Sequence, residues 1–289
     1  MKLVTFVENG SSHVGALRTQ NGQELVVDLG AAAPGLPTDM IALLEAGGSA
    51  LARARDAVAK STAGRPLSEV KLKAPIPRPG KIICIGLNYS DHAAETGQAI
   101  PTVPIVFAKY ENTVIADGES IVLPKVSQQV DYEAELGFVI GRRGRYISEA
   151  DALSYVMGYL PVNDVSARDY QNRTSQWTMG KTFDTFAPMG PAITTADEIR
   201  DPHNLNIRLT IGSEVLQNSN TRNLIFGIPK LVASLSEVMT LEPGDIVSTG
   251  TPPGVGSARK PPRWLRPGDV VRIEIEGIGV LSNPVVAES

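Results

Sequence analysis

The chain has 289 residues, a formal charge of −4 at pH 7 and one cysteine, Cys84. This length allows a substantial core in one large domain or two smaller ones. A weakly acidic chain without a block of like charge is not typical of proteins whose main partner is nucleic acid or an anionic membrane surface. One cysteine excludes an internal disulfide, and we recognise neither a signal peptide nor an apolar run of about 18 residues. We therefore expect a soluble, cytoplasmic protein.

The first part of the chain predicts a small module of strands followed by helices. Asn9-Gly10 and Asn21-Gly22 separate its strand-like runs and favour hairpin turns. The strands are expected at residues 1–7, 13–19 and 24–29, and the helices at residues 38–45 (with Thr38 as the N-cap) and 49–60. The proline-dense segment 74–80 cannot be helical and is stiff as a spacer. We therefore place a boundary there, with a small α/β module at residues 1–73 and the main domain at residues 74–289.

The main domain is dominated by strand-like runs joined by long loops, where functional residues tend to concentrate. Strands are expected at residues 81–86, 105–109, 133–140, 152–160, 206–211, 245–248 and 270–276, with short helical runs at 148–152 and 228–239. This pattern indicates a β-rich α+β fold.

The most informative segment is Val130–Ile140, in which three carboxylates alternate with apolar residues. Along a strand, Asp131, Glu133 and Glu135 point to one face, and the run continues into an apolar segment that must be buried. Buried carboxylates repel one another unless a cation lies between them, and Mg²⁺ prefers oxygen ligands. The alternative is the wet face of a half-exposed strand. With only three histidines in the chain, a metal site here would use mostly oxygen.

Two further segments carry acid and base candidates. Asp164 ends an apolar run, from which it could reach the same site as Glu133 and Glu135, although aspartate is also an ordinary turn or cap residue. His92 and Glu95 are three residues apart, so on a helical turn the carboxylate could orient the imidazole as a general base for water. The alternative is an exposed helix pair of no consequence. The flanking glycines favour a mobile, closing segment.

Lys181 is a candidate for a fixed cation. It lies between glycine and apolar residues, where it could stabilise a developing oxyanion or a substrate carboxylate. Gly180-Lys181-Thr182 echoes a phosphate loop, but position 175 is serine where that motif requires glycine, so we reject nucleotide binding. The glycine-rich segment 250–256 predicts a rigid loop that could cradle an anion.

These motifs, in this order, resemble the fumarylacetoacetate hydrolase family over essentially all of residues 81–289. The matching segments are Ile85-Gly-Leu-Asn-Tyr with His92 and Glu95, Asp131-Tyr-Glu-Ala-Glu-Leu, Asn163-Asp-Val-Ser-Ala-Arg-Asp, Gly180-Lys-Thr-Phe-Asp-Thr-Phe and Ser248-Thr-Gly-Thr-Pro-Pro-Gly-Val-Gly. The stretch that begins at Val255 is most similar to the branch that contains mitochondrial domain proteins of this family and their bacterial relatives.

The resemblance implies a set of roles and a fold. Glu133, Glu135 and Asp164 would bind Mg²⁺ or Mn²⁺. His92 and Glu95 would form the catalytic dyad of a lid, with Lys181 beside the reacting oxygen. Substrate contacts are implied for Arg168, Gln171 and Thr251. The implied fold is a mixed β-sandwich roll, commonly a homodimer, with a smaller N-terminal module.

The leading interpretation is a Mg²⁺-dependent enzyme that hydrolyses a C–C bond of a β-diketo acid of the acylpyruvate type. His92 would activate the water, and the metal and Lys181 would hold the resulting enolate. The same enolate occurs in oxaloacetate decarboxylation and in oxaloacetate keto–enol tautomerisation, which are the alternatives. A non-catalytic metabolite-binding protein is a third hypothesis. The enzyme hypotheses all take a small 2-oxo acid as the substrate, and the sequence does not identify its distal group.

Overall fold

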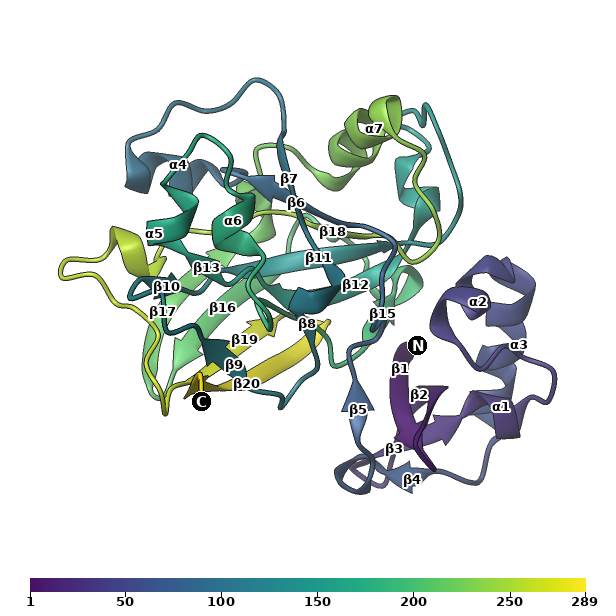
Figure 1. Ribbon diagram of the computed structural model, residues 1–289. Coiled ribbons are helices and arrows are strands. Elements are labelled where there is room, and N and C mark those ends of the chain that lie inside the picture. The colour runs from purple at the N-terminus through teal and green to yellow at the C-terminus, as the bar shows by residue number, and fades with distance from the viewer.

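The computed structural model describes residues 1–289, and its strands form two large sheets (Figure 1). The larger sheet contains, in spatial order, β4 (Arg65–Pro66), β3 (Gln23–Asp28), β2 (Ser11–Gln20), β1 (Lys2–Glu8), β15 (Ile193–Thr195), β12 (Val156–Asn163), β11 (Ala134–Ile140), β18 (Ile246–Ser248), β6 (Ile82–Gly86) and β7 (Ile105–Lys109), and β5 (Leu72–Lys73) pairs with β1. The second sheet contains β17 (Glu214–Asn220), β16 (Asn206–Ile211), β19 (Val270–Ile275), β20 (Gly279–Ala287) and β9 (Ile121–Leu123). Short pairs are formed by β10 (Val130–Asp131) with β13 (Ser166–Ala167) and by β8 (Val114–Ile115) with β14 (Ala187–Pro188).

Helices are short and lie at the edges of this arrangement. They are α1 (Leu29–Ala32), α2 (Met40–Glu45), α3 (Gly47–Lys60), α4 (Ser90–Thr96), α5 (Arg168–Gln171), α6 (Thr178–Lys181) and α7 (Ile228–Val238). Figure 1 shows α1, α2 and α3 grouped beside β1–β3, whereas α4, α5 and α6 lie together at the other side of the molecule. None of the helices combines the length and apolarity needed to cross a bilayer.

The main core lies between the two sheets. In β19 buried and exposed residues alternate, as expected for a strand with one face on a core. β11 is buried along its whole length because both of its faces are covered. Leu136 and Phe138 belong to the core between the sheets, whereas Val139 belongs to a second core on the opposite face. The expected β-rich α+β sandwich fold is confirmed.

The N-terminal strands continue the larger sheet. β1 pairs with β15 in an antiparallel register that places Lys2 opposite Thr194 and Leu3 opposite Ile193. The second core also contains residues from both parts of the chain, among them Leu43 and Val162. The division between residues 1–73 and 74–289 stays a prediction, but the two parts share one sheet and one core.

Several local details differ from the sequence-based expectations. The strand expected from Glu133 begins at Ala134, because residues 132 and 133, between β10 and β11, pair with no neighbouring strand. Residues Ala152–Tyr155 form a 3₁₀ turn before β12 rather than the start of a strand. Helix α2 is capped by Asp39 and not by Thr38, since the Asp39 carboxylate accepts the Ala42 N–H at 3.0 Å. Strands β17 and β20 were not expected.

Candidate active site

Three carboxylates meet where β11 begins and β12 ends. These strands are antiparallel neighbours with Ala134 opposite Asn163, so Glu133 and Glu135, on either side of Ala134, come close to Asp164. One oxygen of each carboxylate lies within 4.8 Å of one oxygen of each of the others. Exposure is 6% for Glu133, 2% for Glu135 and 0% for Asp164. The predicted cluster is thus assembled and buried, which rules out the wet-face alternative for Glu133 and Glu135.

Glu133 and Asp164 share a lysine and each has one further cationic partner. Lys181 Nζ donates to Glu133 Oε2 at 2.8 Å and to Asp164 Oδ2 at 2.7 Å. The other oxygens accept from Arg168 Nη2 at 2.6 Å and from Lys109 Nζ at 2.5 Å, respectively. Burial alone would lower the pKa of Lys181, but the charges of Asp164 and Glu133 raise it above its ordinary value. Lys181 is therefore a permanent ammonium group that carries positive charge into the site.

Glu135 has a different environment. Its Oε2 accepts from Ser248 Oγ at 2.6 Å and from Gly250 N at 2.9 Å, and no cationic side chain bridges to it. Burial, followed by the charges of Asp164 and Glu133, raises the pKa of Glu135 to about 8. Burial also disfavours the ionised form of Glu133, but Lys181 and Arg168 lower the pKa of Glu133 to about 2.

This donor set fits a hard divalent cation. Such ions prefer carboxylate oxygens, and the charge of a cation beside Glu135 would oppose the effect of burial and of the neighbouring carboxylates on its pKa. Glu133, Glu135 and Asp164 are the residues that would hold the ion. The second acidic group with suitable spacing, Glu8 with His13 and Asp28, is only half-buried.

Glu133 and Glu135 line a cavity of about 230 Å³, and Asp164 lies behind them. Its polar side includes Glu133, Glu135, Lys181, Arg168, Gln171, Thr251, His92, Asn172, Gln98 and Ser257. Phe107 and Trp177 form an apolar wall with their ring centroids 5.6 Å apart, and the Lys181 ammonium lies 4.9 Å from the centroid of the Phe107 ring. A Cβ atom at Gly86 would lie 2.2 Å from Cζ3 of Trp177, so only glycine lets this ring lie against the end of β6.

His92 of the predicted dyad lines the same cavity and lies on helix α4. His92 Nδ1 lies 3.1 Å from Glu95 Oε2, and Glu95 Oε1 accepts the Gly254 N–H at 2.9 Å. Because Nδ1 is used on Glu95, Nε2 is the nitrogen available to a substrate. The expected helical i,i+3 arrangement is present, and it ties α4 to the loop after β18.

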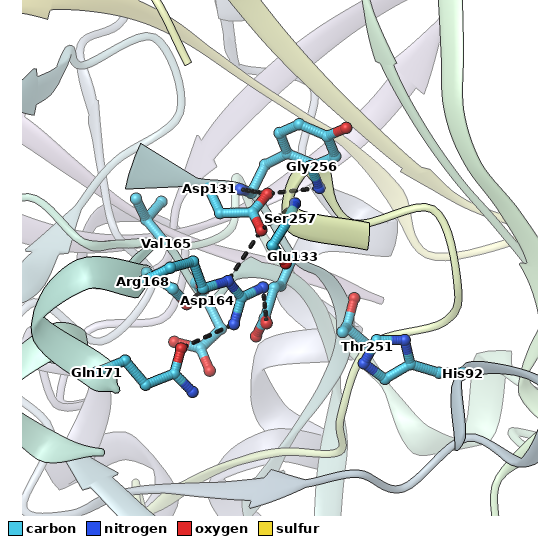
Figure 2. Close-up of polar contacts among 12 residues, drawn as sticks. His92, Asp131, Glu133, Asp164, Val165, Arg168, Gln171, Thr251, Gly256 and Ser257 are labelled. Carbon is cyan, nitrogen blue, oxygen red and sulfur yellow. Dashed lines mark hydrogen bonds and ion pairs between the residues drawn. The ribbon is translucent and has the colours of Figure 1, made fainter. Parts of the chain in front are cut away.

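The three predicted substrate-binding residues also line the cavity, but most of their polar atoms have partners in the protein. Thr251 Oγ donates to Ala134 O at 3.0 Å, so its hydroxyl proton is not available to a substrate carboxylate. Arg168 uses three N–H groups on Asp131, Glu133 and Gln171. Figure 2 shows the Arg168 guanidinium between Asp131 and Glu133, with His92 and Thr251 on another side of the site. Substrate contact by these residues stays a prediction.

A family model described as the C-terminal domain of fumarylacetoacetate (FAA) hydrolase matches residues 81–286. The chain belongs to the fumarylacetoacetate hydrolase family. This confirms the family resemblance drawn from the five motifs and identifies the chain as a fumarylacetoacetate hydrolase family enzyme.

Relatives of this family enzyme match it along nearly its whole length. It is 48% identical to oxaloacetate tautomerase fahd2, mitochondrial, of Xenopus laevis over 99% of this chain and 90% of that protein. Identity to the human oxaloacetate tautomerase FAHD2A, mitochondrial, is 46% over 95% of this chain and 87% of that protein. A solved structure of maleylpyruvate hydrolase from Sphingobium sp. SYK-6 in complex with manganese(II) and pyruvate superposes with a TM-score of 0.82 at 32% identity, covering 100% of both chains.

These relatives correct one expectation and reorder another. The expected cytoplasmic location is wrong, because the names of the relatives place them in mitochondria. The expectation was based on charge and on the lack of a recognised targeting segment, and neither of these identifies a compartment. The relatives also favour tautomerisation of oxaloacetate, which the sequence left as an alternative, over the hydrolysis that it favoured. The metal-bound neighbour supports a divalent-metal site. The homodimer stays a prediction.

Sequence reasoning missed two residues of this fumarylacetoacetate hydrolase family site and misplaced a third. Lys109 was not assigned to the site, and Ser248 was only part of a motif. The strand pattern grouped Asp131 with Glu133 and Glu135 as carboxylates around one cation, but Asp131 lies outside the cluster that these two form with Asp164. Lys109 is fully buried and binds Asp164, which lies 55 positions later in the chain. A signal for Lys109 existed, since a lysine at the end of the apolar run of β7 needs a buried anionic partner.

Proposed function

We propose that this protein is a divalent-metal-dependent oxaloacetate keto–enol tautomerase, with Mg²⁺ or Mn²⁺ as the metal. The observation that carries the proposal is the 46–48% identity, over 95–99% of this chain, to proteins named oxaloacetate tautomerase. The assembled carboxylates, Lys181 and the His92–Glu95 pair around one cavity supply the groups that such a reaction needs.

Tautomerisation moves one proton from C3 to the oxygen on C2, or the reverse. A divalent ion, when bound, supplies a Lewis acid that favours the enolate of a 2-oxo acid. In the protein, His92 is the base that removes the C3 proton through Nε2, and Glu95 stabilises the imidazolium that results. Lys181 stabilises the negative charge that develops on the C2 oxygen. His92 then returns the proton to that oxygen, so no water is consumed.

Aromatic rings form one side of the cavity. Phe107 and Trp177 cover the side next to Lys181, which strengthens the interaction between the ammonium group and a developing oxyanion. Hydrogen-bond donors on the polar side of the cavity bind the substrate carboxylate. Gln171 is one of them, and Arg168 orients its amide toward the cavity.

A second candidate is hydrolytic C–C cleavage of an acylpyruvate. A specific observation favours it: the structural neighbour with manganese and pyruvate is named a maleylpyruvate hydrolase. In that reaction His92 would deprotonate water rather than substrate. The two candidates therefore differ in whether water is a reactant and whether pyruvate is released.

The deciding experiment supplies oxaloacetate and an acylpyruvate separately to the protein with Mg²⁺ or Mn²⁺. We expect faster decay of the enol absorbance of oxaloacetate without pyruvate release, and loss of that acceleration after chelation. His92→Asn should lower the rate on the order of 10²-fold or more. Pyruvate release from the acylpyruvate, with enol decay no faster than in buffer, would transfer the assignment to the hydrolase.

A further inference from the structure

Asp131 is a fully buried carboxylate that lies next to the site but not in the cavity lining. Its oxygens accept four hydrogen bonds. Two of the donors are the N–H groups of Gly256 at 2.7 Å and Ser257 at 3.0 Å, and the others are Tyr132 N at 2.8 Å and Arg168 Nε at 2.9 Å. Burial of a carboxylate costs several kcal/mol unless its oxygens are satisfied in this way. Asp131 thus joins three separate segments of the chain at one point.

On one side, Asp131 fixes Arg168, and Arg168 fixes Gln171. Arg168 Nη1 donates to Gln171 Oε1 at 2.9 Å (Figure 2). Because a guanidinium has only donors, the oxygen of the Gln171 amide must face it and the NH₂ group must be the other end. Gln171 lines the cavity. The orientation of Arg168 therefore determines that the cavity receives a hydrogen-bond donor, which a substrate carboxylate or enolate oxygen requires.

On the other side, Asp131 fixes the loop after β18. Ser257 and Val255 line the cavity, and Gly254 N holds the Glu95 carboxylate at 2.9 Å. A Cβ atom at Gly256 would lie 2.6 Å from Asp131 Oδ1 and 2.1 Å from the backbone oxygen of Arg263, so the carboxylate reaches this loop only because residue 256 is glycine.

We propose that Asp131 is a positioning residue for substrate binding: it orients Arg168, and through it the Gln171 amide donor, and it holds the loop wall at Gly256 and Ser257. The proposal rests on the proposed function for the identity of the ligand, a 2-oxo acid or its enolate. Asp131 does not touch the ligand. Its effect belongs mainly to binding, because Arg168, Gln171 and Ser257 line the cavity, whereas Asp131 makes no hydrogen bond to His92 or Lys181.

The test uses oxalate, an enolate mimic, because its binding is measured without turnover. Asp131→Asn keeps the shape of the side chain but turns an NH₂ group toward donors that include Arg168 Nε. We expect the Kd of oxalate, measured by titration calorimetry in the presence of Mn²⁺, to rise roughly tenfold or more. KM for oxaloacetate should rise by a similar factor, with a smaller change in kcat.

The matched control is Asp245→Asn. Asp245 is 1% exposed and has a comparable environment, since it accepts from Glu242 N at 2.8 Å and pairs with Lys81 at 2.6 Å. Neither Asp245 nor Lys81 lines the cavity. This variant should lose stability to a similar degree and bind oxalate as the wild type does.

A double-mutant cycle separates positioning from general destabilisation. If Asp131 acts partly through Gln171, Asp131→Asn costs less oxalate affinity in a Gln171→Leu background than alone. Gln171→Glu keeps an acceptor toward Arg168 but replaces the donor in the cavity, so it should weaken oxalate binding by at least tenfold, and it answers the question even if Asp131→Asn fails to fold.

Three results would each overturn the proposal. The first is that folded Asp131→Asn binds oxalate as tightly as the wild type, and the second is that Gln171→Glu does so. The third is that the effects in the double-mutant cycle are additive. Failure of the proposed function has a different signature. In that case the wild type would bind oxalate and show the coupling between positions 131 and 171, yet leave the enol decay of oxaloacetate unchanged.

Discussion

At the scale of single residues, His203 closes the N-terminal end of helix α7. The N-cap position, Gly227, has no side chain to accept a hydrogen bond, and His203 Nε2 accepts the Ile228 N–H at 3.0 Å instead. Only a neutral imidazole can accept in this way. Burial lowers the pKa of His203 below its ordinary value of 6.5, and nearby Asp201 opposes this shift in part.

This contact predicts a pH-dependent stability. The unfolded chain takes up a proton at His203 near pH 6.5 while the folded chain does not, so stability falls as the pH drops through about 6.5 and levels off below the folded pKa. His203→Gln retains an acceptor but does not titrate. We expect the free energy of unfolding of the wild type, relative to this variant, to decrease between about pH 7 and pH 5, with a limiting slope of about 1.4 kcal/mol per pH unit.

Denaturant titrations across that pH range measure the effect. Near pH 8 the imidazole is neutral in both states, so the difference between the two proteins there is the internal reference. A difference that stays constant from pH 8 to pH 5 would show that the imidazole does not cap α7 in solution.

The residues of the candidate site differ in how far local sequence could identify them. The spacing of Glu133 and Glu135 and the i,i+3 spacing of His92 and Glu95 are properties of one strand and one helical turn, and the structure contains both. The partners of these residues depend on pairing between distant segments. Ser248 reaches Glu135 because β18 lies beside β11, and no local pattern specifies that pairing.

At the scale of elements, the close packing of α5 and α6 places Gln171 and Lys181 at one cavity. Gly180 makes the approach possible, because a Cβ atom there would lie 2.4 Å from Gln171 N and 2.6 Å from Ala167 O, which are backbone atoms. Gly180→Ala must therefore push the helices apart. We expect a loss of about 1–3 kcal/mol in stability and a rate at least roughly tenfold lower, since Lys181 follows directly in the chain.

Gly48→Ala is the matched control for this substitution. Gly48 lies in helix α3, and a Cβ atom added there would have no neighbouring atom within 4 Å, so alanine should be neutral or stabilising by about 0.5–1 kcal/mol. Equal effects of the two substitutions on activity would contradict the packing argument.

Prediction of the elements succeeded where pattern and burial agree. Helix α7 and strand β16 have clear 3.6- and 2-residue periodicities, and both were expected close to their observed bounds. Strand β17 was missed because Glu214–Asn220 is mostly polar and lacks an alternating apolar pattern, and its conformation comes from pairing with β16. Residues 132 and 133 were expected to lie in the strand, but their backbone N–H groups bind side-chain oxygens of Asp131 and Asn163 instead of a neighbouring strand.

At the scale of the whole molecule, the N-terminal strands and helices complete the catalytic sheet. Their apolar side chains pack in a core that also contains Val139 of β11 and Ile246 of β18, and Ile41 of α2 lies against Gly244, which precedes β18. β11 and β18 carry Glu135 and Ser248 of the site. Without the first 73 residues, residues 74–289 would expose this face of the sheet. We therefore expect the chain to unfold as one cooperative unit.

The two tryptophans give a direct test of this expectation. Trp177 and Trp264 both lie in the part after residue 73, so their fluorescence reports on that part alone.

Leu43→Ala changes a fully buried residue of α2 in the N-terminal part and should cost roughly 2–5 kcal/mol. If the parts unfold together, the fluorescence transition shifts to lower denaturant, and the free energy of unfolding that it reports falls by about 2–5 kcal/mol. The circular dichroism transition shifts with it. Gln23→Ala, at an exposed position of β3, should leave both signals unchanged. A fluorescence transition that stays in place while circular dichroism shows an earlier step would mean that the N-terminal part is an independent domain, because only then can its core lose a leucine without weakening the sheet that holds the carboxylates.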